Sequence, residues 1–263
     1  MDKNLIKALL LVCFFSWSLV LVYRLLSGSS FYMTSEEFHS IYAILLTPIF
    51  KWIPGIVAIC FSYKECIALK FFRKPQRGDL LAGLLGLIIP SLAVLLSLPF
   101  ASLNPLTISL PTLGTLLFII MPCNIFFALG EEVLWRGYFY TKTAHWNFLT
   151  QSLVIGCIWG VWHLPLISIG FDYPGHFLLG MCLMLLLTTG LSPVFLYYRL
   201  VGESLLAPTL LHGTFNTFAV FLLGFFAKPT LLIGGAGFIG AGIAWIFFII
   251  YIQKLKKQTV QQA

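Results

Sequence analysis

The sequence predicts an all-α, polytopic membrane protein in which about eight transmembrane helices enclose a polar chamber. Of its 263 residues, 59% are hydrophobic and only 10% are charged, whereas a soluble domain usually carries about 25% charged residues. Most apolar residues fall in runs that approach the roughly 20 residues needed to cross a bilayer. Because no soluble domain interrupts these runs, we expect one membrane domain over residues 1–263.

Eight apolar runs are the predicted transmembrane helices. In chain order they are 5–25, 41–62, 80–99, 114–139, 150–167, 177–198, 204–223 and 230–252. The first run follows Lys3 and Lys7 as a signal peptide would, but no small-x-small cleavage pattern follows it, so a retained helix is expected. Lys51 and Pro54 interrupt the second run, which leaves one kinked helix or two shorter pieces open.

The basic residues predict the orientation of the helices. Lys and Arg gather in the connection 63–79, at Lys142 and Arg199, and in the C-terminal tail. Three connections between the other helix ends contain no Lys or Arg, namely 26–40, 100–113 and 168–176. The positive-inside rule then places both termini in the cytoplasm, with Lys228 as the exception. The net charge of +7 therefore belongs to membrane topology, and no basic face predicts nucleic-acid binding.

Apart from Lys51 and residues near the helix ends, five charged or imidazole side chains lie inside predicted helices: Glu131, Glu132, Arg136, His163 and His212. Such groups are costly in lipid and usually mark a functional site. At 1.5 Å per residue, Glu131, His163 and His212 lie roughly 15, 20 and 12 Å from the cytoplasmic ends of their helices. We therefore expect three helices to bring polar groups to a similar depth.

The helical spacing predicts which of these side chains share a face. Glu132 and Arg136 are four residues apart, so they should pair, whereas Glu131 is rotated by about 100° and should face elsewhere. A purely structural role, in which both acids only bind Arg136, remains an alternative. Trp159 lies one turn before His163. Taken alone, His163 would be explained equally well as a packing residue.

Two further polar features complete the candidate site. His212 and Asn216 share a helix face, an arrangement that also occurs where polar residues only bridge helices. Lys51 either lines a cavity or extends toward the membrane surface, and the sequence leaves both open.

Three short motifs carry a resemblance to a known family. They are Glu131-Glu132-xxx-Arg136, Trp159-xxx-His163 and His212-xxx-Asn216. In this order they resemble the signature of the CAAX prenyl protease type 2 family, also called the CPBP (CAAX protease and bacteriocin-processing) family of intramembrane endopeptidases. The resemblance covers residues 115–220, with Trp where the family more often has Phe. It implies a helical fold around a hydrophilic chamber that opens to the cytoplasmic side.

The resemblance also implies a role for each motif residue. Glu131 would be the base that activates water, His163 would hold that water, His212 and Asn216 would stabilise the oxyanion, and Glu132 and Arg136 would support the geometry. The chemistry of the residues agrees, because a carboxylate can deprotonate water and aimed donors stabilise a developing oxyanion.

A metal ion is an open question at this stage. Glu131, His163 and His212 form a two-His, one-carboxylate set with room for water, the number of ligands expected of catalytic zinc. The family is often described as metalloproteases. However, the sequence has no HExxH motif, and Asn216 and Glu132 would also complete a metal-free site.

The sequence therefore predicts an endopeptidase that acts in the membrane. Its substrate would be a membrane-anchored protein, including a prenylated CAAX-type protein, or a small hydrophobic peptide, with the lipid bilayer as its surroundings and no nucleic acid as a partner. The alternative is a non-catalytic bacteriocin-immunity or scaffold membrane protein. A secondary transporter is disfavoured because no internal repeat is visible. Substrate identity and oligomeric state are left open.

Overall fold

The computed structural model describes residues 2–27, 41–67, 74–103, 110–228 and 230–261. Within these ranges the chain is all-α and forms no β-strand. Eight helical stretches of the described chain are long and apolar enough to cross a membrane, which confirms the predicted class and the predicted number of spans.

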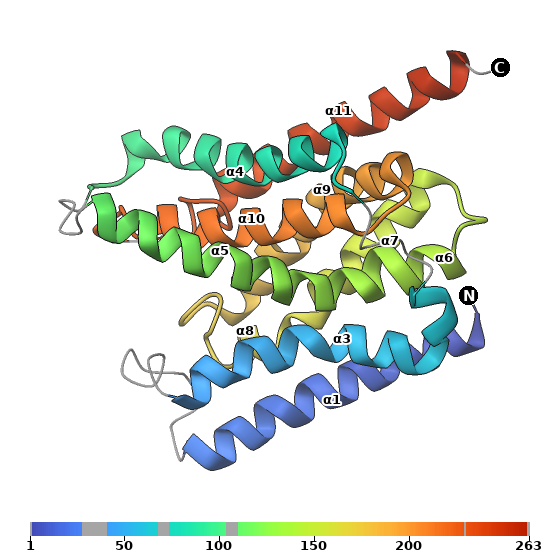
Figure 1. Cartoon of the computed structure of the whole chain (residues 1–263). Coiled ribbons are helices and arrows are strands. Elements are labelled where there is room, and N and C mark those ends of the chain that lie inside the picture. The colour runs from blue at the N-terminus through green and yellow to red at the C-terminus, as the bar shows by residue number, and fades with distance from the viewer. Residues whose placement is uncertain (1, 28–40, 68–73, 104–109, 229, 262–263) are drawn as a thin grey trace.

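The elements follow the predicted runs closely (Figure 1). They are α1 Lys3–Ser27, α3 Ile41–Ile67, α4 Arg77–Ser97, the 3₁₀ turn η1 Leu98–Phe100, α5 Leu110–Glu132, the π-helix η2 Val133–Phe139, α6 Tyr140–Lys142, α7 Phe148–Trp162, α8 Leu164–Ser168, α9 Phe177–Gly202, α10 Leu206–Leu223 and α11 Phe238–Gln261.

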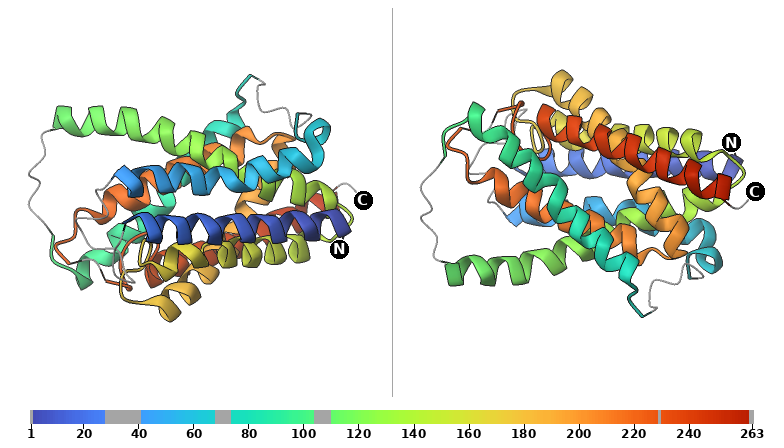
Figure 2. Two further views of the ribbon diagram at one scale, coloured as in Figure 1. Left: turned by 90° about the horizontal axis from the view of Figure 1, so that it is seen from below. Right: turned by 90° about the horizontal axis from the view of Figure 1, so that it is seen from above.

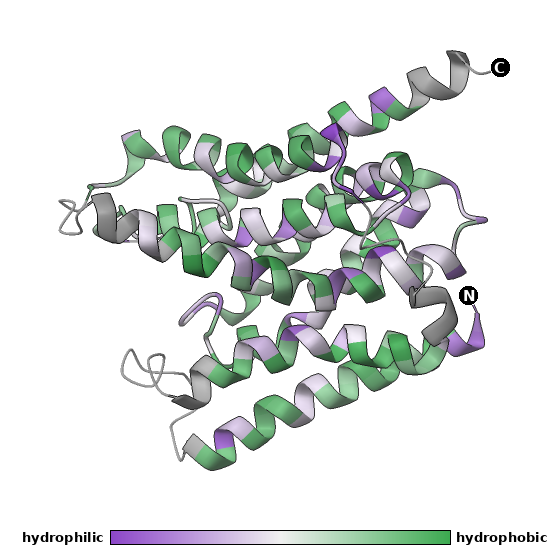
Figure 3. Ribbon diagram, viewed as in Figure 1, coloured by the Kyte–Doolittle hydropathy of each residue, from purple (hydrophilic) through white to green (hydrophobic). Residues whose placement is uncertain are grey.

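Helix α10 lies inside the bundle and packs extensively against α4 and α5, while α7 pairs with α9 and α1 pairs with α3 (Figures 1 and 2). Both termini lie at one end of the bundle (Figure 1). We call this the termini end; it also holds the connections 143–147 and 203–205. The distal end holds the connections 169–176 and 224–237. In Figure 3 most of each long helix is hydrophobic, and hydrophilic segments lie in connections at both ends of the bundle.

The distribution of side chains is the reverse of that in a soluble protein. Large apolar side chains face outward, with Phe118 81% and Val220 75% exposed, whereas Glu131, Glu132 and Arg136 are 0% exposed. An extensive apolar surface is stable in lipid, where contact with hydrocarbon replaces contact with water. The charged groups must therefore satisfy one another inside the bundle.

Two glycines allow α3 to lie directly against α5. A Cβ atom on Gly130 would lie 2.7 Å from the Lys51 carbonyl oxygen, and one on Gly55 would lie 2.6 Å from the Gly130 carbonyl oxygen. Small residues let the backbones of membrane helices approach closely. Because Gly130 directly precedes Glu131, this contact brings Lys51 beside that carboxylate.

The structure answers the question about the second span. α3 continues as one helix through Lys51 and Pro54, and its backbone leaves helical geometry at Ser62, with φ −156° and ψ 58°. The last span differs from its predicted bounds, because α11 begins at Phe238 rather than at residue 230. The preceding turns include Gly234 at φ 82°, a left-handed conformation that glycine adopts readily and that a helix cannot contain.

The α3–α5 contact makes a direct prediction about stability. Replacing Gly130 with Ala should lower the melting temperature of the purified protein in detergent, because the new methyl group would overlap the α3 backbone and overpacking typically costs about 1–3 kcal/mol. Gly114→Ala is the matched control, since it lies in the same helix and its Cβ would meet nothing within 4 Å. Equal melting temperatures for the two variants would contradict the packing described.

Candidate functional site

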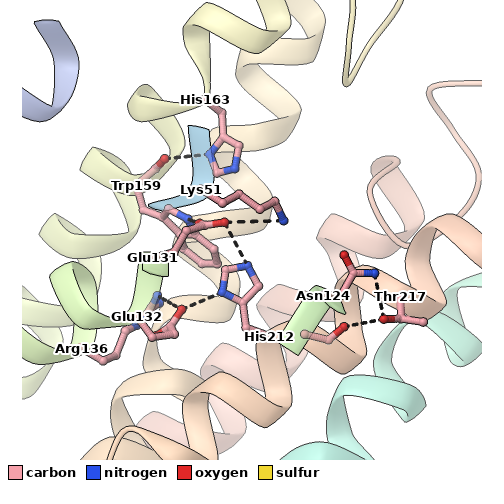
Figure 4. Close-up of polar contacts among 10 residues, drawn as sticks. Lys51, Asn124, Glu131, Glu132, Arg136, Trp159, His163, His212 and Thr217 are labelled. Atoms are coloured by element: carbon pink, nitrogen blue, oxygen red, sulfur yellow. Dashed lines mark hydrogen bonds and ion pairs between the residues drawn. The ribbon is translucent and has the colours of Figure 1, made fainter. Parts of the chain in front are cut away.

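The motif residues from three helices meet at one side of a large cavity (Figure 4). The cavity volume is about 1320 Å³. Glu131, Trp159, His163, His212 and Asn216 all line it. The ring of Trp159 lies between the two imidazoles, with its centroid 6.1 Å from that of His163 and 5.2 Å from that of His212.

Glu131 lines the cavity, and its two carboxylate oxygens have different partners. Its Oε2 accepts a hydrogen bond of 2.8 Å from the Trp159 indole N–H. Its Oε1 is buried without a hydrogen-bond donor, and the Lys51 ammonium lies 3.6 Å from it. A buried carboxylate oxygen without a donor is costly. It is therefore ready to accept a hydrogen bond, or a proton, from a molecule in the cavity.

Glu132, the next residue, does not line the cavity, although its Oε2 is likewise buried without a donor. Its Oε1 accepts a hydrogen bond of 3.1 Å from Arg136 Nη1 and lies 2.7 Å from His212 Nδ1. The Arg136 guanidinium also stacks over the rings of Trp159 and Phe195, 4.5 and 4.4 Å from their centroids. Glu132 thus has a cationic partner and joins α10 to the end of α5. The structural alternative, with both acids bound to Arg136, does not describe Glu131.

The contact with Glu132 sets the tautomer of His212. A carboxylate oxygen only accepts hydrogen bonds, so the 2.7 Å contact requires a proton on Nδ1 and leaves Nε2 of the neutral ring as an acceptor. Nε2 lies 3.8 Å from Glu131 Oε1. Glu132 therefore orients the imidazole, and His212 turns its free nitrogen toward Glu131.

His163 lies at a helix break that the sequence analysis did not predict. The expected single helix over 150–167 is two helices, α7 and α8, because Pro165 lacks an N–H and its ring would clash with the carbonyl four residues earlier. The His163 backbone N–H then donates to Gly160 at 3.1 Å, rather than to Trp159 as in a regular α-helix.

The break also orients the His163 side chain. The carbonyl of Trp159, released from the helical pattern, accepts a 2.9 Å hydrogen bond from the His163 ring Nδ1. Since a carbonyl cannot donate, Nδ1 carries the proton and Nε2 is the acceptor. Both cavity histidines therefore have a free Nε2.

A second helical irregularity follows the acidic pair. Residues 133–139 form a π-helix, and all seven are buried. Such segments occur mostly within α-helices and often at functional sites. The sequence analysis predicted a regular helix over 114–139, and nothing in the residue pattern distinguishes the π-helix from an α-helix.

Three residues outside the motifs also line the cavity. Lys51 has a side chain only 15% exposed, so of its two predicted positions the structure supports the cavity. Asn124 was missed; its amide donates to the Thr217 hydroxyl at 3.0 Å. A signal was present, because Asn124 lies seven residues, or two helical turns, before Glu131 and shares its face. Asp172 was also missed, since an acidic residue in a connection is ordinary in sequence.

The character and direction of the cavity differ from the expected polar chamber. Most lining residues are apolar, such as Phe50, Leu187 and Phe215, and the polar groups form a cluster on the wall. The cavity extends from this cluster to the connections 171–176 and 224–237 of the distal end. The sequence analysis expected both a chamber that opens to the cytoplasm and termini that lie in the cytoplasm. Because the cavity leads away from the termini end, only one of these two expectations can hold.

The arrangement of donors does not fit a zinc site. Among the described residues, no three His, Cys, Asp or Glu side chains are grouped so that they could hold a metal ion. In addition, the Lys51 ammonium lies 3.6 Å from Glu131 Oε1, where its charge would repel a bound cation. No step below therefore involves a metal.

Comparison with known proteins places the motifs in a family. Residues 112–218 match the family model described as Rce1-like, type II CAAX prenyl endopeptidase, which confirms the resemblance predicted from the three motifs. The match covers the three motifs, including Glu131, His163 and His212, but not Lys51. No curated protein matches the chain.

Asp172 gives a prediction about pH. Burial raises the pKa of its carboxyl above the ordinary value, despite the charges on His163 and Lys51, which lower it. Between the ordinary and the raised pKa the folded protein binds more protons than the unfolded chain, so stability falls as the pH rises through this window. Asp172→Asn removes the effect and should be more stable than the wild type at neutral pH.

The comparison uses melting temperatures of both proteins in detergent at a series of pH values. The advantage of Asp172→Asn should shrink as the pH falls toward about 4, the ordinary value for Asp. Other titrating groups are common to both proteins and cancel in the difference. A difference that does not depend on pH, or a variant less stable at neutral pH, would contradict the burial of a charged carboxylate.

Proposed function

We propose that this chain, with its Rce1-like segment, is an intramembrane endopeptidase in which Glu131 activates water to hydrolyse a peptide bond. The observation that carries the proposal is the pair of adjacent carboxylates with different surroundings. Each acid has one buried oxygen without a hydrogen-bond donor. Glu132 is held by Arg136 and His212 and does not line the cavity, whereas Glu131 lines it. Environments that separate two carboxylates in this way commonly separate their roles in catalysis.

In the proposed first step, Glu131 Oε1 takes a proton from water while the water oxygen attacks the peptide carbonyl carbon. The second hydrogen of this water is donated to His163 Nε2, which is an acceptor in its assigned tautomer. As the tetrahedral intermediate collapses, Glu131 returns the proton to the leaving amine nitrogen, so the carboxylate is regenerated. A positioned base of this kind contributes typically about 10²–10⁴-fold to the rate.

The oxyanion of this intermediate needs donors. In the tautomer that donates Nδ1–H to Glu132, neutral His212 has no proton on Nε2, so it does not serve as the oxyanion donor that the family resemblance implies. We assign this role to the Asn216 amide and the Lys51 ammonium, which both line the cavity. One such donor is worth about 3–4 kcal/mol of transition-state stabilisation.

The proposed substrate is a membrane-associated or hydrophobic polypeptide. One observation supports this class: most lining side chains of the cavity are apolar. The lining also includes Ile120 of α5 and Val220 of α10, which are 44% and 75% exposed.

We also propose that both termini are cytoplasmic. Outside the site, most described basic side chains lie at or near the termini end: Lys3, Lys7, Lys74, Arg77, Lys142, Arg199 and Lys254. Arg24 and Lys228 lie at the distal end. The positive-inside rule supports this orientation.

Replacing Glu131 with Gln should reduce cleavage by at least about 10²-fold without loss of folding, because the amide keeps the shape but cannot take the proton. Mass spectrometry of membrane peptides from cells with wild-type or Glu131→Gln protein identifies the substrate. The cleavage rate is then measured with each purified protein. Glu203→Gln, on the surface of the termini end, is the matched control. Undiminished cleavage by Glu131→Gln would exclude the proposed base. If the protein protects cells against a bacteriocin and this protection survives the substitution, the alternative of a non-catalytic immunity protein would be favoured.

Metal chelation separates the two mechanisms that the sequence left open. Cleavage should persist after treatment with 1,10-phenanthroline and dialysis against EDTA, because the proposed steps use only side chains and water. The rate is measured with the purified protein on the same substrate before and after treatment. Loss of cleavage that zinc restores would refute the metal-free mechanism. If zinc does not restore cleavage, the melting temperature shows whether the treatment has unfolded the protein.

A further inference from the structure

The cavity leads from the site to the distal end of the bundle. Its lining includes residues of the connections 171–176 and 224–237, and Pro174, His176 and Thr230 are exposed at this rim. Within the described chain, none of the lining residues comes from the connections of the termini end. A molecule that reaches Glu131 through this cavity therefore passes the distal rim or the lipid-facing side, and not the termini end.

Buried side chains close the site toward the termini end. The π-helix Val133–Phe139 lies between Glu131 and that end, and all of its residues are buried. The Arg136 guanidinium fills the space beside it by stacking on Trp159 and Phe195. Opening a path here would separate Arg136 from Glu132 and leave a buried charge without its partner, which is strongly destabilising.

The distribution of charge assigns the distal end to a side of the membrane. Lys and Arg predominate at the termini end, which the positive-inside rule places in the cytoplasm. We propose that the cavity opens to the non-cytoplasmic side, so that the substrate is an exported peptide or the non-cytoplasmic part of a membrane protein. The identification of the molecule in the cavity as a substrate rests on the proposed function, but the direction of the opening can be tested without any cleavage.

Cysteine labelling in intact cells tests the direction. In a background with the native cysteines replaced by Ser or Ala, single cysteines are introduced at four sites: Leu187→Cys in the cavity wall, Leu186→Cys on the adjacent outward face, Thr230→Cys at the distal rim and Ala144→Cys at the termini end. Leu187 is 5% exposed and Leu186 is 41% exposed. The probe is a charged, membrane-impermeant methanethiosulfonate reagent, and each variant is first shown to keep the melting temperature of the background.

We expect the reagent to modify Thr230→Cys and Leu187→Cys in intact cells, and Ala144→Cys only after permeabilisation. Leu186→Cys should resist modification in both cases although it is more exposed, because it faces lipid and a charged reagent is excluded from hydrocarbon. Modification of Leu187→Cys only after permeabilisation would place the opening in the cytoplasm and overturn the inference. Absence of modification under both conditions would overturn it as well, since the cavity would then be closed to water.

A substitution separates this result from the failure of the proposed function. The same four cysteines are introduced together with Glu131→Gln, which removes the proposed base but none of the rim or wall residues. An unchanged labelling pattern would support the direction of the opening whether or not the chain proves to be a protease. Labelling from the outside without any detectable cleavage by the wild type would instead refute only the enzymatic role.

Discussion

The rest of the site depends on the ion pair between Glu132 and Arg136, deep inside a bundle whose outer surface is apolar. Its two charges are 0% exposed and 3.1 Å apart, and the guanidinium is further stabilised by the rings of Trp159 and Phe195. Since removing one partner of a buried pair leaves a charge without compensation, this pair fixes the end of α5. His212 then takes its orientation from the same carboxylate.

Two residues that carry no charge determine the geometry around Glu131. Gly130 lets α3 approach so closely that Lys51 reaches the carboxylate, and Pro165 interrupts the helix so that the Trp159 carbonyl can orient His163. Both act through the backbone. The chemistry proposed for the charged residues thus depends on Gly130, which has no Cβ atom, and on Pro165, which has no backbone N–H.

Hydropathy and charge in the sequence were sufficient for the eight spans, and together with the three motifs they identified the residues that meet at the cavity wall, apart from Asn124 and Asp172. Each signal is local: an apolar run of sufficient length, or an ionisable residue within it. The break at His163, the π-helix after Glu132 and the position of Lys51 could not be predicted, because they depend on contacts between helices. Asp172 lies in a connection, where only the packed structure reveals that its carboxyl is near the site. The direction of the cavity likewise follows from packing and not from the order of the motifs.

The most direct test of the central claim is the protonation of the two cavity imidazoles, measured by ¹⁵N NMR of the histidine-labelled protein in lipid. Substituting His163 and His212 one at a time assigns their signals among the five histidines. The structure predicts that both neutral rings carry the proton on Nδ1, donated to Trp159 in one case and to Glu132 in the other. A proton on Nε2 of His212 would contradict the account, because Glu132 would then not orient the ring and Nε2 would be a donor facing Glu131.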